Sequence, residues 1–512
     1  MTTASRQRSP SHNACEQIIG WQAAAGLGDQ PAILAGSCSV SYAELTAMTN
    51  AVGNALLSHG IKPDDRILLL TKDSPEMVAA YMAVMKIGAI AVALNTRSSA
   101  REIGHAMADS QCSAFILDPE FRPLFQSGSD ISEYLPPLVI DDVAEFSAGA
   151  STELEACPVL PTDKAFLIYT SGTTGAAKAA IHRHGDVSIG DLHLRVNFNV
   201  RPGDRVFSTS KLFFAFALGH SMIGALKCGA TIILHDGWPD ADGVAAVVEQ
   251  HSPTILLSVP TLYRNLLRSR VTGLPAFKGI RHFISAGERL PDSVFMEWLE
   301  ETKRPILEGI GTSEIVFLAI ANTPSAYRKG SSGRPQPWAT VKLIGEDGQP
   351  VRKPDQTGVL WLKMASVAAG YWNRADKTAE AFQKGWYCTG DIFSFDADGW
   401  WEHHGRGDDM LKISGQWVSP AEIEEHALKV PGIIEAAAVG VTNEDGLVRL
   451  GLAVVSADHA PGQDILEESL RQHFERNLSI YKCPRRIRFV EAMPRTVTGK
   501  LQRFRVRDFF AQ

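Results

Sequence analysis

The chain has 512 residues and a formal net charge of -7; 45% of its residues are hydrophobic and 21% are charged. This composition is ordinary for a globular protein and excludes a disordered or fibrous chain. A net negative charge without a basic footprint argues against nucleic acid as a partner. At roughly 100–200 residues per domain, the length predicts about three folding units, enough to enclose an active site.

The cysteines and the distribution of apolar residues indicate where in the cell the protein is expected. Seven cysteines are scattered without a C-x-x-C pair, so neither a disulfide framework nor a zinc site is predicted, and a reducing cytoplasm fits best. The polar segment 1–15 lacks the apolar stretch of a secretory signal. The most apolar window, 77–94, contains Lys86 and Gly88, which favours a buried helix and strand. We therefore expect no membrane anchoring.

From about residue 40 to 300, short apolar runs alternate with helix-length amphipathic stretches, which is typical of βα units around a largely parallel sheet. Ser74, Pro75 and Glu76 have the chemistry of a helix start. The later strands run into loops, where open α/β sheets place their ligand sites. The predicted strands are Asp65–Leu70, Ala89–Leu94, Lys164–Ile168, Thr254–Val259 and His282–Ala286.

Between about 330 and 405 the pattern changes to short strands interrupted by Gly, Asp and Pro, such as Val341–Ile344, Gly358–Leu362 and Gly399–Trp401, which indicates a β-rich subdomain. The polar stretch Gly405–Asp409 then precedes a βαβ-like segment. This stretch is the best candidate for a domain boundary. We expect domains at residues 1–407 and 408–512.

The segment Tyr169–Lys178 is the most informative motif. Gly172 and Gly175 let backbone N–H groups converge on an anion, the neighbouring hydroxyls add donors, and Lys178 adds a positive charge. Ala179 follows the lysine where a Walker A loop has Ser or Thr. The segment therefore predicts a phosphate-binding loop of another kind, with a Gly/Thr-rich surface turn as the alternative.

This segment resembles the signature loop of the adenylate-forming superfamily of acyl-CoA synthetases, luciferases and peptide-synthetase adenylation domains. The resemblance spans about residues 30 to 505. It implies an α/β fold with a large N-terminal domain of βα-layered subdomains, a small β-rich subdomain and a smaller mobile α+β C-terminal domain. The further matching segments, in order, are Ser285–Glu288, Gly311–Glu314, Gly330–Pro335, Gly370–Asn373, Trp386–Asp391, Gly405–Asp409 and Pro494–Lys500.

The resemblance implies a set of ATP contacts. Glu314 would help to position Mg²⁺ through the phosphates, and Asp391, supported by Arg406, would accept hydrogen bonds from the ribose hydroxyls. A solvated loop carboxylate is the alternative for Glu314, and a surface charge is the alternative for the other two. The expected ATP-binding residues are Thr170, Ser171, Gly172, Thr173, Thr174, Gly175, Lys178, Thr312, Ser313, Asp391 and Arg406.

Three residues would be catalytic: Lys500, Glu314 and Lys178. When a carboxylate attacks the α-phosphate, two anionic groups approach each other, and Lys500 would bridge them. Asp408 falls on the family's hinge position, where the C-terminal domain swings between half-reactions. The implied coenzyme A contacts are Lys412, Ser414, Gly415 and Trp417, although Trp417 could equally be a packing residue.

The segment Lys211–His220 most closely resembles benzoate-CoA and related aryl-CoA ligases, and the resemblance implies a compact, largely apolar pocket for a flat ring. The expected substrate is benzoate or a small substituted benzoate such as anthranilate or hydroxybenzoate. His220 either hydrogen-bonds a ring substituent or is a satisfied core histidine; the latter is favoured. The implied pocket residues are Phe214, Ala215, Phe216, His220, Ala286, Gly287, Ile310, Gly311 and Phe317.

Some positions depart from the family pattern. Ala177 replaces the usual proline, Ala179 often a glycine, and Ile310 a frequent aromatic residue. None of these changes removes a reacting group. Ile310 also occurs in the benzoate-type branch, whereas Phe317 and His220 differ from the polar residues expected there, so the ring substituents stay open.

The predicted protein is therefore a ligase that uses ATP, Mg²⁺ and coenzyme A and makes an acyl-AMP and then an acyl-CoA thioester. We expect it in the cytoplasm, and a homodimer is possible. One alternative is an adenylation enzyme that loads an aryl acid onto a carrier protein; another is a small- or medium-chain aliphatic acyl-CoA synthetase. A nucleotide-binding protein without catalysis is a third hypothesis, and the intact Lys178, Glu314, Asp391 and Lys500 argue against it. Luciferase-like oxidation is a remote fourth.

Overall fold

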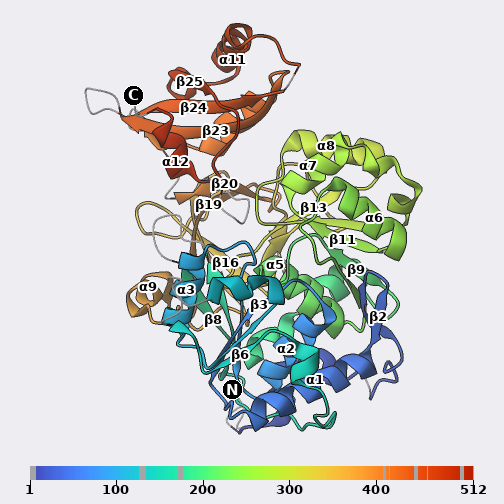
Figure 1. Ribbon diagram of the computed structural model, residues 1–512. Coiled ribbons are helices and arrows are strands. Elements are labelled where there is room, and N and C mark those ends of the chain that lie inside the picture. Colours follow the sequence, from blue (N-terminus) through green and yellow to red (C-terminus); the bar gives the residue numbers. More distant parts are fainter. Residues whose placement is uncertain are drawn as a thin grey trace.

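The structure is a computed structural model (Figure 1), and it describes residues 7–22, 24–125, 134–170, 177–407, 411–413, 416–442, 448–457, 459–495 and 501–510. The fold consists of two large βα-layered sheets, a β-rich subdomain and a C-terminal unit. Among the described residues, no helix has the length and apolar character that crossing a membrane requires.

A six-stranded sheet forms the first layer. Its strand order is β6-β5-β3-β4-β7-β8; the first five strands are parallel, and β8 returns antiparallel to β7. Both faces of the sheet are covered, which explains the continuous apolar sequence of β3 and β4. The strands are β3 (Arg66–Leu70), β4 (Ile90–Ala93), β5 (Ala114–Leu117), β6 (Leu138–Ile140), β7 (Lys164–Thr170) and β8 (Lys178–Arg183).

The helices of this layer begin at side-chain caps. Ser74 accepts a hydrogen bond from the backbone N–H of Met77 at 3.1 Å, which confirms the predicted helix start. Helix α3 begins with a capping box between Ser99 and Glu102. The helices are α1 (Tyr42–Ser58), α2 (Pro75–Lys86), α3 (Ala100–Ser110) and α4 (Val143–Phe146).

A nine-stranded sheet in the order β15-β14-β13-β12-β11-β9-β10-β1-β2 forms the second layer. The βα pattern of the sequence thus divides between two sheets, because β1 and β2 join the second sheet although they precede the first in the chain. The strands are β1 (Pro31–Ala35), β2 (Cys38–Ser41), β9 (Arg205–Ser208), β10 (Thr231–Leu234), β11 (Ile255–Ser258), β12 (His282–Ser285), β13 (Ile306–Ile310), β14 (Ile320–Ala321) and β15 (Arg334–Pro335).

The helices of the second layer are α5 (Ala215–Ala217), the π-helical segment η8 (Leu218–Ala225), α6 (Ala241–His251), α7 (Pro260–Arg268) and α8 (Asp292–Thr302). Short helical segments connect the elements of the chain: η2 (Pro10–His12), η3 (Glu16–Gly20), η4 (Pro119–Phe125), η6 (His184–Ile189), η7 (His193–Asn197), η9 (Val271–Gly273), η10 (Pro275–Gly279) and η12 (Ile480–Lys482). Segments η7 and η8 contact each other beside the functional site described below.

The β-rich subdomain is an antiparallel sheet of β16 (Thr340–Ile344), β17 (Gly358–Lys363), β18 (Phe382–Gln383), β19 (Trp386–Phe395) and β20 (Trp401–Arg406), with helix α9 (Ala375–Ala381). The strands at Val341–Ile344 and Gly358–Leu362 are as predicted. The strand predicted at Gly399 begins only at Trp401, because Gly399 adopts a φ of 80° in the turn that reverses the chain.

The C-terminal unit has a hydrophobic core of its own and lies at the orange-to-red end of Figure 1, next to β19 and β20. It touches the N-terminal part through polar contacts: Arg289 and Glu425 form an ion pair of 2.5 Å, and Arg264 donates to the carbonyl of Ile434. Its elements are β21 (Leu411–Ile413), β22 (Gln416–Val418), α10 (Pro420–Leu428), β23 (Ile433–Thr442), β24 (Val448–Ser456), α11 (Gln463–Asn477), β25 (Arg486–Phe489) and α12 (Arg503–Asp508).

Candidate functional site

Lys178 stands at the start of β8, directly across the antiparallel ladder from Thr170 at the end of β7. Its Nζ lies 4.4 Å from the centre of the Tyr371 ring, a cation–π contact that fixes where the ammonium group points. The other predicted phosphate-loop residues, Ser171 to Gly175, lie outside the described residues. The hairpin therefore places the two ends of the predicted loop side by side, with the Lys178 end against Tyr371.

Glu314 is joined to the same tyrosine. The Tyr371 hydroxyl donates to Glu314 Oε1 at 2.7 Å, and the Glu314 carboxylate is buried. Burial, together with this neighbouring carboxylate, raises the pKa of Tyr371, so the phenol remains a donor. A cation on β8, Lys178, an aromatic ring in a loop, Tyr371, and a carboxylate in a second loop, Glu314, thus form one connected group.

The loop after β13 that contains Glu314 is firmly held. His182 on β8 donates from Nε2 to the carbonyl of Ser313 at 2.8 Å, and Thr312 Oγ1 accepts from the Glu314 backbone N–H. Val316 adopts a φ of 61°, which is strained for a β-branched residue. Such strain persists only where the surroundings over-determine the conformation, and it gathers at functional sites.

Asp391 on β19 is buried beside two cationic or titratable side chains. Arg406 lies opposite it in the β19–β20 ladder, with Nε 3.9 Å from Asp391 Oδ1. His403 Nε2 lies 3.4 Å from the same oxygen. A carboxylate fixed in this way can accept hydrogen bonds from a neutral polyol such as a ribose, so the geometry is compatible with the predicted role.

The predicted acyl residues come from four segments that meet near the carboxyl ends of the parallel strands. Ala286 and Gly287 follow β12, Ile310 ends β13 with Gly311 directly after it, and Phe317 follows the strained Val316. Phe214 caps α5, Ala215 and Phe216 lie on α5, and His220 lies on η8. Gly219 in η8 allows the close approach, since a Cβ there would lie 2.7 Å from Val316 Cγ1.

His220 packs against two of these aromatic residues. The centre of its ring lies 5.3 Å from that of Phe216 and 5.9 Å from that of Phe317. Its Nδ1 lies 3.2 Å from the carbonyl oxygen of Phe216, while Nε2 is buried without a hydrogen-bond partner among the described residues. His220 is thus a core histidine, as the favoured interpretation expects, with Nδ1 satisfied by the protein and Nε2 left as a polar atom without a protein partner among the described residues.

Several predicted residues fall on undescribed parts. Asp408, Ser414, Gly415 and Lys500 lie outside the described residues. The backbones of Lys412 and Trp417 pair across the β21–β22 ladder, but their side chains are not described. The hinge, the catalytic lysine and the predicted coenzyme A contacts therefore stay predictions.

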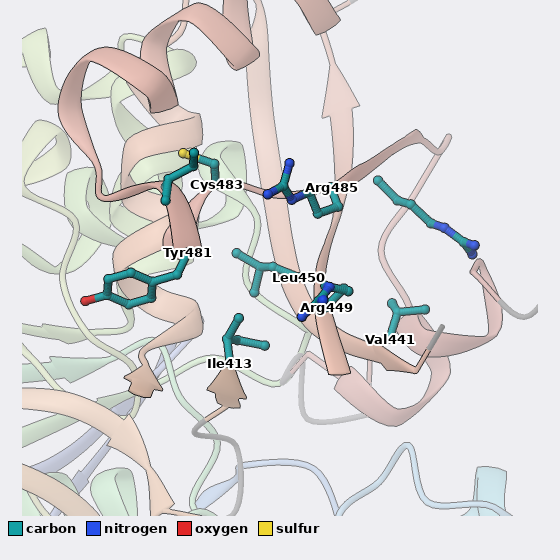
Figure 2. A pocket seen from close by; sticks show the side chains of 9 residues that line it. Ile413, Val441, Arg449, Leu450, Tyr481, Cys483 and Arg485 are labelled. Carbon is teal, nitrogen blue, oxygen red and sulfur yellow. The ribbon is translucent and has the colours of Figure 1, made fainter. Parts of the chain in front are cut away.

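The C-terminal unit contains a cavity of about 510 Å³ that sequence reasoning missed. Figure 2 shows Tyr481 at one side of it, with Arg485 from the same stretch of chain and Arg449 from β24. Arginines and an aromatic ring form a surface suited to a phosphorylated nucleotide. A signal was present in the run Tyr481–Arg486, which combines an aromatic residue with adjacent basic residues.

A buried carboxyl, Glu308 on β13, was also missed. It accepts hydrogen bonds from the Leu290 backbone N–H at 2.7 Å and from Ser332 Oγ at 3.1 Å. Burial raises its pKa to about 7, against the lowering effect of these bonds and of nearby Arg289. Glu308 thus joins β13 to the segment around Ser332, and a glutamate within an apolar strand was its only sequence signal.

Comparison with known proteins decides the family. Residues 20–372 match the AMP-binding enzyme model, and residues 422–500 match the AMP-binding enzyme C-terminal domain. The chain belongs to the AMP-binding enzyme family. The superfamily predicted from the ordered motifs is thereby confirmed.

Members of the AMP-binding enzyme family resemble this chain over nearly its whole length. It is 49% identical to a 3-hydroxybenzoate–CoA ligase of Aromatoleum sp. (strain CIB), over 98% of this chain and 97% of that protein. It is also 49% identical to a 3-hydroxybenzoate–CoA/4-hydroxybenzoate–CoA ligase of Thauera aromatica, over 98% of each chain. The crystal structure of the anthranilate CoA ligase AuaEII with anthranoyl-AMP superimposes with a TM-score of 0.90 at 32% identity, covering 97% of each chain. The predicted fold class, including the β-rich subdomain and the smaller C-terminal domain, is confirmed by this match.

Proposed function

We propose that this AMP-binding enzyme is an aryl-CoA ligase whose preferred acid is a hydroxybenzoate. The observation that carries the proposal is the 49% identity, over almost the full length, to a 3-hydroxybenzoate–CoA ligase. The site supports it, since aromatic side chains surround a buried imidazole with a free nitrogen.

The first half-reaction would join the acid to ATP. A carboxylate oxygen of the acid bonds to the α-phosphorus, the bond from that phosphorus to the bridging oxygen breaks, and pyrophosphate leaves. Lys178, held over Tyr371, would neutralise charge on the departing phosphates. Lys500 would stabilise the charge that develops where the two anionic reactants meet. Asp391, held by Arg406, would bind the ribose hydroxyls.

The magnesium ion expected in this family fits the donor set. Mg²⁺ is usually bound by one or two carboxylates together with substrate phosphates and waters. Glu314 is one buried carboxylate, fixed by Tyr371, and the described residues contain no cluster of three acidic, histidine or cysteine ligands. Glu314 would therefore hold the ion together with the phosphates. When bound, the ion supplies charge neutralisation of the phosphate oxygens.

The second half-reaction would transfer the acyl group to coenzyme A. The thiol sulfur bonds to the carbonyl carbon, the thiol loses its proton, and AMP leaves as the bond to its phosphate oxygen breaks. We propose that the C-terminal unit, from residue 408 onward, rotates about Asp408 between the two steps. The cavity lined by Tyr481, Arg449 and Arg485 would bind the phosphorylated nucleotide of coenzyme A.

The scattered cysteines support a cytoplasmic location, where ATP and coenzyme A are available. Transfer to a carrier protein is the second candidate acceptor. The arginine-lined cavity favours free coenzyme A, because a carrier-bound phosphopantetheine has no 3′-phosphoadenosine group to fill it.

The test is a panel assay of AMP and pyrophosphate release with ATP and Mg²⁺. The acids would be 3-hydroxybenzoate, 4-hydroxybenzoate, benzoate, anthranilate and medium-chain fatty acids, with either coenzyme A or a holo carrier protein as acceptor. We expect the highest kcat/KM with a hydroxybenzoate and thioester formation with coenzyme A. Activity restricted to aliphatic acids would refute the aromatic assignment, and thioester formation only on the carrier protein would refute the acceptor.

A further inference from the structure

Two buried histidines lie against each other beside the proposed acyl site. The rings of His193 on η7 and His220 on η8 pack edge to face, with centroids 5.3 Å apart and planes at 86°. Both side chains are almost completely buried. The Nε2 atom of each has no hydrogen-bond partner among the residues that the structure describes. Two orphaned polar atoms in one buried contact need an explanation, and a polar group that fits between them supplies one.

The hydrogen bonds around Gln336 fix the tautomer of His193. Gln336 Nε2 faces two acceptors, the carbonyl oxygens of Ala321 and Arg334, so it must be the amino end of that side chain. Its Oε1 is therefore an acceptor, and it lies 2.7 Å from Asn197 Nδ2, which must donate.

The same Asn197 amino group lies 3.1 Å from His193 Nδ1. Since that group can only donate, Nδ1 of His193 accepts and bears no proton. Burial lowers the pKa of His193 well below its usual value, so the ring is neutral and carries its single proton on Nε2. The orphaned atom of His193 is consequently a donor.

His220 has the opposite tautomer. Its Nδ1 lies 3.2 Å from the carbonyl oxygen of Phe216, which can only accept, so Nδ1 carries the proton. Burial lowers the pKa of His220 to about 4, and the neutral ring therefore has a bare lone pair on Nε2. The orphaned atom of His220 is an acceptor, and the touching rings present one donor and one acceptor.

We propose that His193 and His220 together bind a hydroxyl group on the ring of the aryl acid: His193 Nε2 donates to the hydroxyl oxygen, and the hydroxyl donates to His220 Nε2. A hydroxyl is both donor and acceptor and satisfies both nitrogens at once. A methoxy group can only accept, and an aromatic amine mainly donates, so each leaves one nitrogen unpaired. The inference rests on the proposed aryl-CoA ligase function and adds a specificity residue, His193, that the motifs did not indicate. Asn197 is a positioning residue, because it acts by holding the His193 tautomer.

The first test compares kcat/KM for 3-hydroxybenzoate, benzoate and 3-methoxybenzoate. We expect the wild-type enzyme to prefer 3-hydroxybenzoate to both other acids by about 10-fold to 100-fold, since a buried group left unpaired is costly. His193→Phe and His220→Phe should each reduce the ratio of kcat/KM for 3-hydroxybenzoate to kcat/KM for benzoate about 10-fold, and this ratio, not the activity on either acid alone, is the readout. His184→Phe is the matched control, because His184 is equally buried and lies on η6, and it should leave the ratio unchanged.

The second test determines the tautomers by NMR and does not depend on enzyme activity. Long-range ¹H–¹⁵N correlation spectra of ¹⁵N-histidine-labelled protein should show His193 protonated at Nε2 and His220 at Nδ1, with the signals assigned by their loss in the two Phe variants. Asn197→Leu should give His193 a mixture of tautomers and leave His220 unchanged.

The outcomes separate the two proposals. Equal kcat/KM for benzoate and 3-hydroxybenzoate, or an unchanged ratio in His193→Phe, would overturn the hydroxyl site while the ligase function stands; a bound water would give this result. The same tautomer in both rings would also overturn it. Failure of every aryl acid to release pyrophosphate would instead refute the proposed function.

Discussion

The hydroxyl of Tyr371 donates a 2.7 Å hydrogen bond to Glu314 Oε1, and the ring of the same tyrosine carries Lys178 Nζ at 4.4 Å. One aromatic side chain therefore orients both charged groups that the family resemblance connects with the phosphates of ATP. Neither contact follows from the motifs, because the three residues belong to separate segments of the chain.

Removing the Tyr371 hydroxyl should impair adenylate formation. Tyr371→Phe keeps the ring under Lys178 but leaves the buried Glu314 carboxylate with one donor fewer. A hydrogen bond to a charged group contributes about 1.5–3 kcal/mol, which corresponds to a loss of roughly 10-fold to 100-fold in pyrophosphate release. We expect a higher Mg²⁺ requirement as well. Tyr263→Phe, which removes a buried hydroxyl bonded only to backbone carbonyls in the structure, should affect stability but not the Mg²⁺ requirement.

Asp391 offers a test of nucleotide binding. Asp391→Asn replaces an acceptor-only carboxylate beside Arg406 and His403 with a neutral amide. We expect the KM for ATP to rise about 10-fold, because charge-assisted hydrogen bonds are the stronger ones, with little change in the KM for the acid. Initial rates at varied ATP and fixed acid measure this, and the exposed Asp464→Asn is the control. An unchanged KM for ATP would contradict the ribose contact.

The arginine-lined cavity predicts a defect confined to the second half-reaction. Arg485→Ala should raise the KM for coenzyme A about 10-fold, since one phosphate contact of about 1.4 kcal/mol is lost, while pyrophosphate release without coenzyme A stays normal. Arg476→Ala, an exposed arginine of the same unit, serves as the comparison. Equal impairment of both half-reactions would show that the cavity has another role.

Glu308 makes stability depend on pH. Its folded-state pKa is raised by burial to about 7, above the ordinary value of 4.5, so the folded protein binds the proton more tightly than the unfolded chain. The contribution of Glu308 to the free energy of unfolding is therefore complete below pH 4.5. It decreases as the pH rises towards 7, by about 3 kcal/mol at most.

Glu308→Gln removes this ionisation. The urea midpoint of the variant minus that of wild type should therefore be larger at pH 8 than at pH 5. The exposed Glu346→Gln should show no such trend. A constant difference across this range would mean that Glu308 does not titrate there.

Much of the architecture was predictable because it depends on local pattern. Strands β3, β4, β7, β11 and β12 lie where apolar runs predicted them, and the Ser74 cap begins α2 as its chemistry requires. The division of the βα pattern into two sheets was missed, because strand pairing is decided by contacts between distant segments. The strand predicted from Gly399 was wrong by two residues, because the residue types Gly399, Trp400 and Trp401 do not show that Gly399 has a positive φ.

The functional site, like the fold, was predictable from the sequence only in part. The sequence by itself determined the family, the order of the motifs and the identity of the charged residues, since these are properties of residue type and spacing. Only the tertiary structure decided that Tyr371 joins Lys178 to Glu314, that Tyr481 shares a cavity with arginines, and that His193 meets His220. A hydrogen bond and a tautomer depend on which distant groups are brought within about 3 Å, and no periodicity along the chain encodes that distance.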